Sequence, residues 1–197
     1  MSRRTTARTA RTVRTARTAR TGGALGAAAL LLATGCTTMS NDDSGRSYDP
    51  QPMKVAAAKD LVRARSSTIF DTAGLREANN GAPDAAPCDG VDDGFRVRHF
   101  WSMYAPTADA LKQAMEKLHK ELPAKGWKVV RFEPAKSEAK QLQLDVEHEK
   151  DHHTATVELL LPSTYKDASK WEKEARDSLS VSVTSPCYTD PEYQVGD

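Results

Sequence analysis

Aromatic residues are scarce in this sequence, at 6% of 197 residues, so a hydrophobic core must rely mainly on aliphatic side chains. Long apolar runs are missing as well. The longest, residues 22–35, is shorter than the about 20 residues that a membrane-spanning helix needs. Only three cysteines are present. These features argue against a spanning segment and predict one modest folded domain.

The chain also lacks a surplus of basic charge once its N-terminus is set aside. Seven arginines lie within residues 1–20, ahead of the first acidic residue, Asp42. The rest of the chain holds 21 lysines and arginines against 27 acidic side chains, a net charge of −6. Nucleic-acid-binding domains normally carry a basic surface. The charge balance therefore argues against nucleic acid as a partner.

The N-terminus has the parts of a secretory signal peptide. Residues 1–21 are basic, with a repeating Arg-Thr-Ala unit and no carboxylate. Residues 22–35 (GGALGAAALLLATG) are apolar and end in small residues. A charged segment followed by an apolar segment of about 7–15 residues and a small-residue end is typical of export signals. We therefore expect residues 1–35 to be a signal peptide.

Residues 32–36, at the junction that follows, read LATGC, in which the small residues Thr34 and Gly35 precede Cys36. This junction resembles the lipobox of bacterial lipoproteins, with Ala33 standing where the family prefers leucine. The Arg-, Ala- and Gly-rich style is similar to that of lipoproteins from high-GC actinobacteria. The resemblance implies that Cys36 carries a diacylglyceryl group and becomes the new N-terminus. The protein would then be anchored on the outer side of the cytoplasmic membrane.

Two alternatives to this predicted location and export route stay open. If Cys36 is incidental to the junction, the protein is secreted in soluble form. If residues 2–4 (SRR) belong to a twin-arginine signal, export follows that route, although Thr6 stands where the signal favours an apolar residue.

The segment after the junction predicts a tether and then a single domain. Residues 36–52 are polar and rich in Ser, Asp, Gly and Pro, which favours a flexible linker. Residues 53–197 remain for one domain, with its core at about residues 95–187.

Apolar residues at helical spacing predict two helices in the first half of this domain. The first covers residues 53–73 and ends at Gly74. The second begins after the N-cap Thr107 and ends at Pro123 and Gly126. Its apolar stripe, at spacings of 4, 3 and 4, consists of Leu111, Met115, Leu118 and Leu122.

Strands are predicted on either side of the second helix. Residues 79–94 indicate a turn-rich loop without periodicity, and residues 95–104 then form a strand. Its buried face would hold Val97, Trp101 and Met103. Another strand covers residues 127–132 directly after the helix.

Alternating apolar and polar residues predict a β-hairpin between residues 142 and 161. With residues 149–152 as its loop, residue 148 pairs with 153, 146 with 155, 144 with 157 and 142 with 159. All four pairs share one face. The opposite face carries Asp145, Glu147 and Glu158, as a solvated sheet face does.

A helix beginning at residues 162–163 and a strand at residues 179–183 complete the expected fold. This helix would place Tyr165, Ala168, Trp171 and Ala175 about one turn apart. The order is an N-terminal helix followed by a β-α-β-β-β-α-β core. We therefore predict an α+β fold, with a mainly antiparallel sheet and helices on one face.

Two cysteines remain once Cys36 is assigned to lipid. Cys88 precedes the first strand of the sheet unit, and Cys187 follows its last strand. In an exported protein such a pair favours a structural disulfide, and the alternative is two free thiols.

The histidines offer the candidate metal site. His148 and His153 become directly opposed in the hairpin register, with His152 beside them. Two imidazoles can bind Zn²⁺, Cu²⁺ or Ni²⁺ if a third ligand, either His99 or Asp151, joins them. The alternative is a polar hairpin tip, since no CxxC or HExxH spacing supports a metal.

Catalytic and cofactor signatures are missing. The sequence has no G-x-S-x-G elbow, P-loop, dinucleotide-binding glycine pattern or Cys-His nucleophile signature, so we expect no cofactor. We expect a non-catalytic, membrane-anchored module that binds an envelope protein, a cell-wall component or a small ligand. One alternative is an extracytoplasmic metal-binding protein that uses His148 and His153, and a second is a cell-envelope hydrolase.

Overall fold

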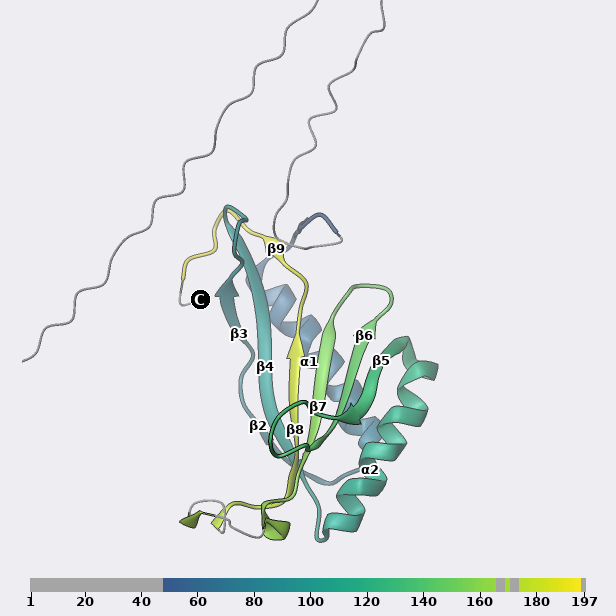
Figure 1. Ribbon diagram of the computed structural model, residues 1–197. Coiled ribbons are helices and arrows are strands. Elements are labelled where there is room, and N and C mark those ends of the chain that lie inside the picture. Colours follow the sequence, from purple (N-terminus) through teal and green to yellow (C-terminus); the bar gives the residue numbers. More distant parts are fainter. Residues whose placement is uncertain (1–47, 166–168, 171–173, 196–197) are drawn as a thin grey trace, which may run out of the picture. The chain divides into compact units, whose positions relative to one another are not determined.

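The computed structural model describes residues 48–165, 169–170 and 174–195 (Figure 1). In this part of the chain the fold is α+β, with a mixed, mostly antiparallel sheet and two α-helices. The elements in chain order are β1 (Gln51–Pro52), α1 (Val55–Ala73), β2 (Glu77–Asn80), β3 (Asp84–Pro87), β4 (Gly94–Tyr104), α2 (Ala108–Glu121), the 3₁₀ helix η1 (Leu122–Lys125), β5 (Trp127–Pro134), β6 (Leu142–His148), β7 (Thr154–Leu160), the 3₁₀ helix η2 (Pro162–Thr164), β8 (Ser178–Thr184) and β9 (Tyr188–Thr189).

Some expectations concern residues outside this part. The predicted signal peptide, Cys36 and the tether up to residue 47 lie outside the described residues, as do Ala168 and Trp171 of the last predicted helix. The end of the predicted tether is described, and its residues Gln51 and Pro52 form β1. None of the described helices combines the length and the apolar character needed to cross a membrane.

Strand β4 makes pairs along both of its edges. It pairs with β2 and β3 on one edge and with β8 and β9 on the other, always antiparallel. Beyond β8 the sheet continues through β7, β6 and β5 in an antiparallel meander. The short strand β1 pairs with β9 in parallel. Figure 1 shows the long β4 beside β8, followed by the β7, β6 and β5 strands.

The prediction of a turn-rich loop over residues 79–94 is wrong in part. Residues Glu77–Asn80 and Asp84–Pro87 form β2 and β3. Neither segment shows the apolar alternation that indicates a strand from sequence. Both form because β4 is 11 residues long, and the edge of β4 opposite β8 offers a row of backbone N–H and C=O groups that require partners.

The helix predicted to begin at residues 162–163 does not continue from there. Pro162–Thr164 is a single 3₁₀ turn, and Tyr165 after it has an extended backbone (φ −73°, ψ 124°). The carboxylate of Asp177 accepts hydrogen bonds from the backbone N–H and the hydroxyl of Ser163, at 3.0 and 2.7 Å. These bonds hold the turn against the start of β8.

The predicted hairpin register is confirmed. Leu144 pairs with Val157 and Val146 with Ala155, in an antiparallel ladder between β6 and β7. The backbone N–H of His148 donates to the carbonyl of His153 at 2.7 Å, so these two histidines are the last pair before the loop.

The predicted end of the first helix and the predicted start of the second are also confirmed, whereas α1 begins at Val55 rather than at residue 53 and α2 gives way to η1 after Glu121. Gly74 follows α1 with φ 72°, a left-handed conformation that glycine adopts without strain. The Thr107 hydroxyl accepts a hydrogen bond from the backbone N–H of Ala110 at 3.2 Å and caps α2. The described part of the chain therefore follows the local signals of its sequence at these helix ends.

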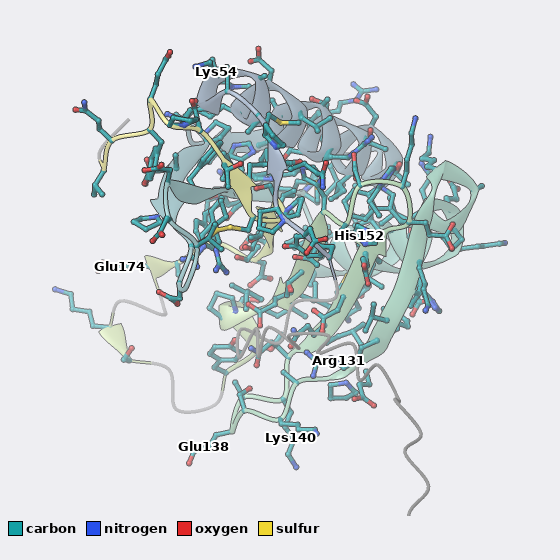
Figure 2. All side chains as sticks on the ribbon, turned by 90° about the horizontal axis from the view of Figure 1, so that it is seen from above. Lys54, Arg131, Glu138, Lys140, His152 and Glu174 are labelled. Atoms are coloured by element: carbon teal, nitrogen blue, oxygen red, sulfur yellow. A yellow bond between two sulfur atoms is a disulfide. The ribbon has the colours of Figure 1, made fainter. Side chains whose placement is uncertain are left out.

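The core forms where the helices meet the sheet. Helix α1 contacts β4 and β8, α2 contacts β7 and β8, and the two helices contact each other. Val97, Trp101 and Met103 on β4 are buried, as predicted, and so is the stripe of α2. Charged side chains such as Glu138 and Lys140 are exposed and point away from the domain (Figure 2).

A disulfide joins Cys88 to Cys187, as predicted, with their Cα atoms 6.2 Å apart. Cys88 follows β3, and Cys187 lies between β8 and β9. Both are buried. The bond thus connects the segments on either side of β4 across 99 residues of sequence.

Replacing both cysteines (Cys88→Ala with Cys187→Ala) should lower the free energy of unfolding by about 4–5 kcal/mol, because a closed loop of this length restricts the unfolded chain. For a domain of this size, that corresponds to a fall in Tm of roughly 10–15 °C. Thermal unfolding of residues 37–197 with and without reductant measures it. Reductant should destabilise the unaltered protein and leave the double variant unchanged. Equal Tm values for the two proteins would contradict a stabilising bond.

Candidate functional site

His99 and His119 lie apart from the pair formed by His148 and His153. The structure brings His148 and His153 together with Asp151, which is one of the two third ligands considered from the sequence. The other, His99, instead contacts Ser66 of α1 and Gly81. His119 on α2 stacks on Phe132, with ring centroids 4.0 Å apart.

The first candidate site, which we call the hairpin cluster, consists of Arg65, His148, Asp151 and His153. The Oδ1 atom of Asp151 lies 2.6 Å from Nδ1 of His148 and 3.0 Å from Nδ1 of His153. Its Oδ2 atom accepts hydrogen bonds from Nε and Nη2 of Arg65 at 3.2 and 2.5 Å. The cluster therefore connects α1 to the loop between β6 and β7.

Local backbone geometry shapes this loop. His152 has φ 55°, the left-handed conformation that reverses the chain before β7. Glu149 donates its backbone N–H to the carbonyl of Gly126 at 3.0 Å. Gly126 has φ 84°, and a Cβ atom there would lie 3.3 Å from Nε2 of His148. A side chain at this position would be strained by the backbone conformation and would press against His148.

Burial and charge act against each other in the hairpin cluster. Burial would raise the pKa of Asp151, but the hydrogen bond from Arg65 and the nearby positive charge outweigh it and hold that pKa below its usual value. Burial lowers the pKa of His153, and the charge of Asp151 opposes the effect only in part. Burial of Tyr188, together with the negative charge of Asp151, raises the pKa of Tyr188 to about 12. At neutral pH the Arg65–Asp151 ion pair is charged and His153 is neutral.

Among the described residues, no group of three or more His, Cys, Asp or Glu side chains is arranged to hold a metal ion. In the hairpin cluster, the 2.6 Å between Nδ1 of His148 and Oδ1 of Asp151 is too short for two ligands of one ion. Bonds of about 2.0–2.1 Å in tetrahedral geometry place two such ligands about 3.3 Å apart. The cluster would have to open for a metal to enter.

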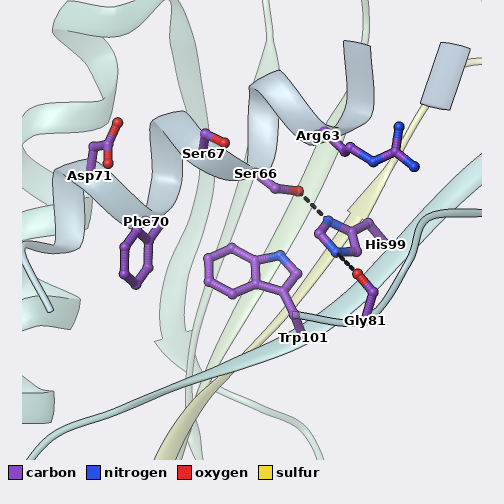
Figure 3. Close-up of a pocket in the computed structure, with 8 residues that line it drawn as sticks. All are labelled: Arg63, Ser66, Ser67, Phe70, Asp71, Gly81, His99 and Trp101. Atoms are coloured by element: carbon purple, nitrogen blue, oxygen red, sulfur yellow. Dashed lines mark hydrogen bonds between the residues drawn. The ribbon is translucent and has the colours of Figure 1, made fainter. Parts of the chain in front are cut away.

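The second candidate site is a pocket beside α1, which we call the α1 pocket (Figure 3). Its volume is about 290 Å³. Helix α1 and strand β4 supply most of its walls, and Gly81 between β2 and β3 closes one side. The lining residues are Arg63, Ser66, Ser67, Phe70, Asp71, Gly81, His99 and Trp101.

His99 is held in one tautomer at the base of this pocket. Its Nε2 lies 2.8 Å from the carbonyl oxygen of Gly81, which only accepts, so Nε2 carries the proton. Burial lowers the pKa of His99 and the charge of Arg63 acts in the same direction, so the imidazole is neutral at pH 7. Its Nδ1, 2.8 Å from Oγ of Ser66, is then an acceptor, and the Ser66 hydroxyl donates to it.

Trp101 gives the pocket an unused donor. The side chain is 5% exposed, and its indole N–H has no acceptor among the described residues. Figure 3 shows the five-membered ring turned toward Ser66 and His99 and the six-membered ring toward Phe70. The ring centroids of Phe70 and Trp101 are 6.1 Å apart at 64°. A buried polar group without a partner is rare and requires an explanation.

Sequence reasoning found the hairpin cluster and missed the α1 pocket. The register of β6 and β7 placed the two histidines opposite each other. The pocket depends on which side of α1 meets β4, and on Gly81 lying in a segment that sequence reasoning treated as loop. The one available signal was Ser66, which with Thr72 is polar among the mainly apolar buried residues of α1.

The chain gives no match when compared with models of protein families, with curated proteins and with solved structures.

The ion pair between Arg65 and Asp151 should contribute measurably to stability. Asp151→Ala leaves the half-buried Arg65 without its carboxylate and should lower the free energy of unfolding by about 1–3 kcal/mol. Asp60→Ala is the matched control, since it breaks the exposed ion pair between Asp60 and Arg63 on α1, the helix that carries Arg65. This change should lower the free energy of unfolding by at most about 1 kcal/mol. Urea unfolding measures both. Equal losses would mean that the cluster adds no more than a surface pair.

Proposed function

We propose that this chain is a membrane-anchored extracytoplasmic lipoprotein whose domain binds a ligand, without catalysing a reaction, in the α1 pocket. The observation that carries the binding role is the buried indole N–H of Trp101, which has no acceptor among the described residues. The Trp101 side chain lines that pocket. Ligand pockets commonly combine aromatic walls with a few polar groups that fix orientation. The α1 pocket has both.

Two independent features support the extracytoplasmic address. The first is the signal-like N-terminus with its lipobox-like end at Cys36. The second is the disulfide between Cys88 and Cys187, because such bonds persist mainly in oxidising compartments outside the cytoplasm. Together they favour a domain that works in the cell envelope.

The proposal extends to the layering of the domain. We propose that both helices cover one face of the sheet, which leaves the other face open to solvent or to an envelope partner. Alternation along β4 supports this, since Trp101 is 5% exposed and its neighbour Phe100 is 63% exposed. The contact between α1 and α2 agrees with it.

The anchor is tested at Cys36. Cys36→Ala should release the full-length protein from membranes and leave its signal peptide uncleaved, because the thiol is the point of lipid attachment in the proposed scheme. Stable retention needs two or more acyl chains, so loss of the lipid should be decisive. Membrane fractionation and intact mass provide the measurement, with Thr37→Ala as the neighbouring control. Retention of the Cys36→Ala protein on membranes would disprove the lipoprotein assignment.

A second candidate function is metal binding at the hairpin cluster. The observation in its favour is that Nδ1 of His148, Nδ1 of His153 and Oδ1 of Asp151 face one another without hydrogen-bond geometry. Opening of the loop between β6 and β7 would then allow the two imidazoles and the carboxylate to surround an ion.

This candidate predicts uptake of one Zn²⁺, Cu²⁺ or Ni²⁺ per chain, measured by elemental analysis after dialysis. Replacing His148 and His153 together with alanine should abolish uptake, whereas His119→Ala on α2 should retain it. Circular dichroism of the double variant checks that it still folds. The same metal content in the folded double variant and the unaltered protein would end the idea.

A further inference from the structure

The polar groups inside the α1 pocket specify what a ligand must offer. The indole N–H of Trp101 is a donor without an acceptor among the described residues. Leaving it unpaired and buried is costly, so a matching ligand places an oxygen acceptor there. The indole N–H of Trp127 also lacks an acceptor in the part of the chain that the structure describes, but Trp127 does not line this pocket.

Ser66 supplies the opposite requirement. Its hydroxyl proton is directed at Nδ1 of His99, because Nε2 of His99 donates to Gly81. The oxygen of Ser66 therefore has only lone pairs to offer the pocket. A ligand that fits here brings an N–H or O–H donor as well as the oxygen that Trp101 requires.

The walls around these two groups are apolar, and the rim is polar. The rings of Phe70 and Trp101 meet edge to face at 6.1 Å and form a surface for a small apolar group. On the exposed rim Arg63 is paired with Asp60, and Asp71 adds a further negative charge, so these three side chains sum to −1. With His99 neutral, this charge disfavours a phosphate or a carboxylate and favours an uncharged ligand over them.

We propose that the α1 pocket binds the acetamido group of an N-acetylated amino sugar. The carbonyl oxygen accepts from the indole N–H of Trp101, the amide N–H donates to Oγ of Ser66, and the methyl group packs on Phe70 and Trp101. The sugar hydroxyls, which both donate and accept, face the polar rim. The volume of about 290 Å³ is at the lower end of ligand pockets and suits one sugar unit.

The inference rests on the proposed binding function and names its ligand class. It is tested by adding N-acetylglucosamine to ¹⁵N-labelled residues 37–197 and following the indole N–H resonances by NMR. The Trp101 resonance should shift saturably, with a Kd of about a millimolar, as is usual for so small a ligand. The Trp127 resonance is the internal control and should not move. Trp101→Phe identifies the Trp101 resonance by its absence.

Variants test each contact separately. Trp101→Phe keeps an aromatic ring but removes the donor, and Ser66→Ala removes the acceptor. Each should weaken binding about tenfold, measured from the sugar signals by saturation transfer. Thr68→Ala changes a hydroxyl residue of the same helix that does not line the pocket, and it should leave the Kd unchanged. Full affinity in both the Trp101→Phe and Ser66→Ala proteins would overturn the inference.

Two further ligands separate this inference from the proposed function. Glucose lacks the acetamido group, and N-methylacetamide has an uncharged amide without the sugar. Both should bind at least about tenfold more weakly than N-acetylglucosamine. If either binds the pocket as tightly, the assignment to an amino sugar falls, while binding in the α1 pocket stands. No response to any of the three ligands would also overturn the assignment, whereas the anchor is decided by the Cys36→Ala experiment alone.

Discussion

Strand β4 forms backbone hydrogen bonds along both of its edges, and the remaining parts of the domain are positioned by this pairing. The edge of β4 opposite β8 pairs with β2 and β3, whose sequences show little tendency to form strands by themselves. Its other edge holds β8 and β9, and β8 carries the meander of β7, β6 and β5. The buried side of β4 receives α1 and presents His99 and Trp101 to it. Both candidate sites follow from where α1 then lies.

Helix α1 reaches two sites with neighbouring residues. Successive residues of an α-helix are rotated by about 100°, so Arg65 and Ser66 point in different directions. Arg65 binds Asp151 at the hairpin, and Ser66 binds His99 on β4. A polar residue on the inner face of a helix normally weakens the core. Here the hydroxyl of Ser66 satisfies a buried imidazole that would otherwise lack a partner.

Local signals were sufficient for much of the fold. Alternation determined the hairpin register, and with it the meeting of His148 and His153, because only one register buries the apolar face. Thr107 and Gly74 marked helix ends through capping chemistry that acts within a few residues. The strands β2 and β3 could not be found in this way, since they form in response to the edge of β4. The α1 pocket depends in addition on contacts such as that between Ser66 and His99, which are 33 residues apart.

The pairing of β4 with β8 also has a kinetic consequence. Arg98 lies opposite Thr184, so the two central strands meet across most of the domain's sequence. Closing such a long loop is slow, because its entropy is lost before the contacts form. In a chain that crosses a membrane from its N-terminus, β4 could not pair with β8 until β8 had also crossed. Late pairing of this kind keeps a polypeptide unfolded, and therefore able to be translocated, until nearly all of it has crossed.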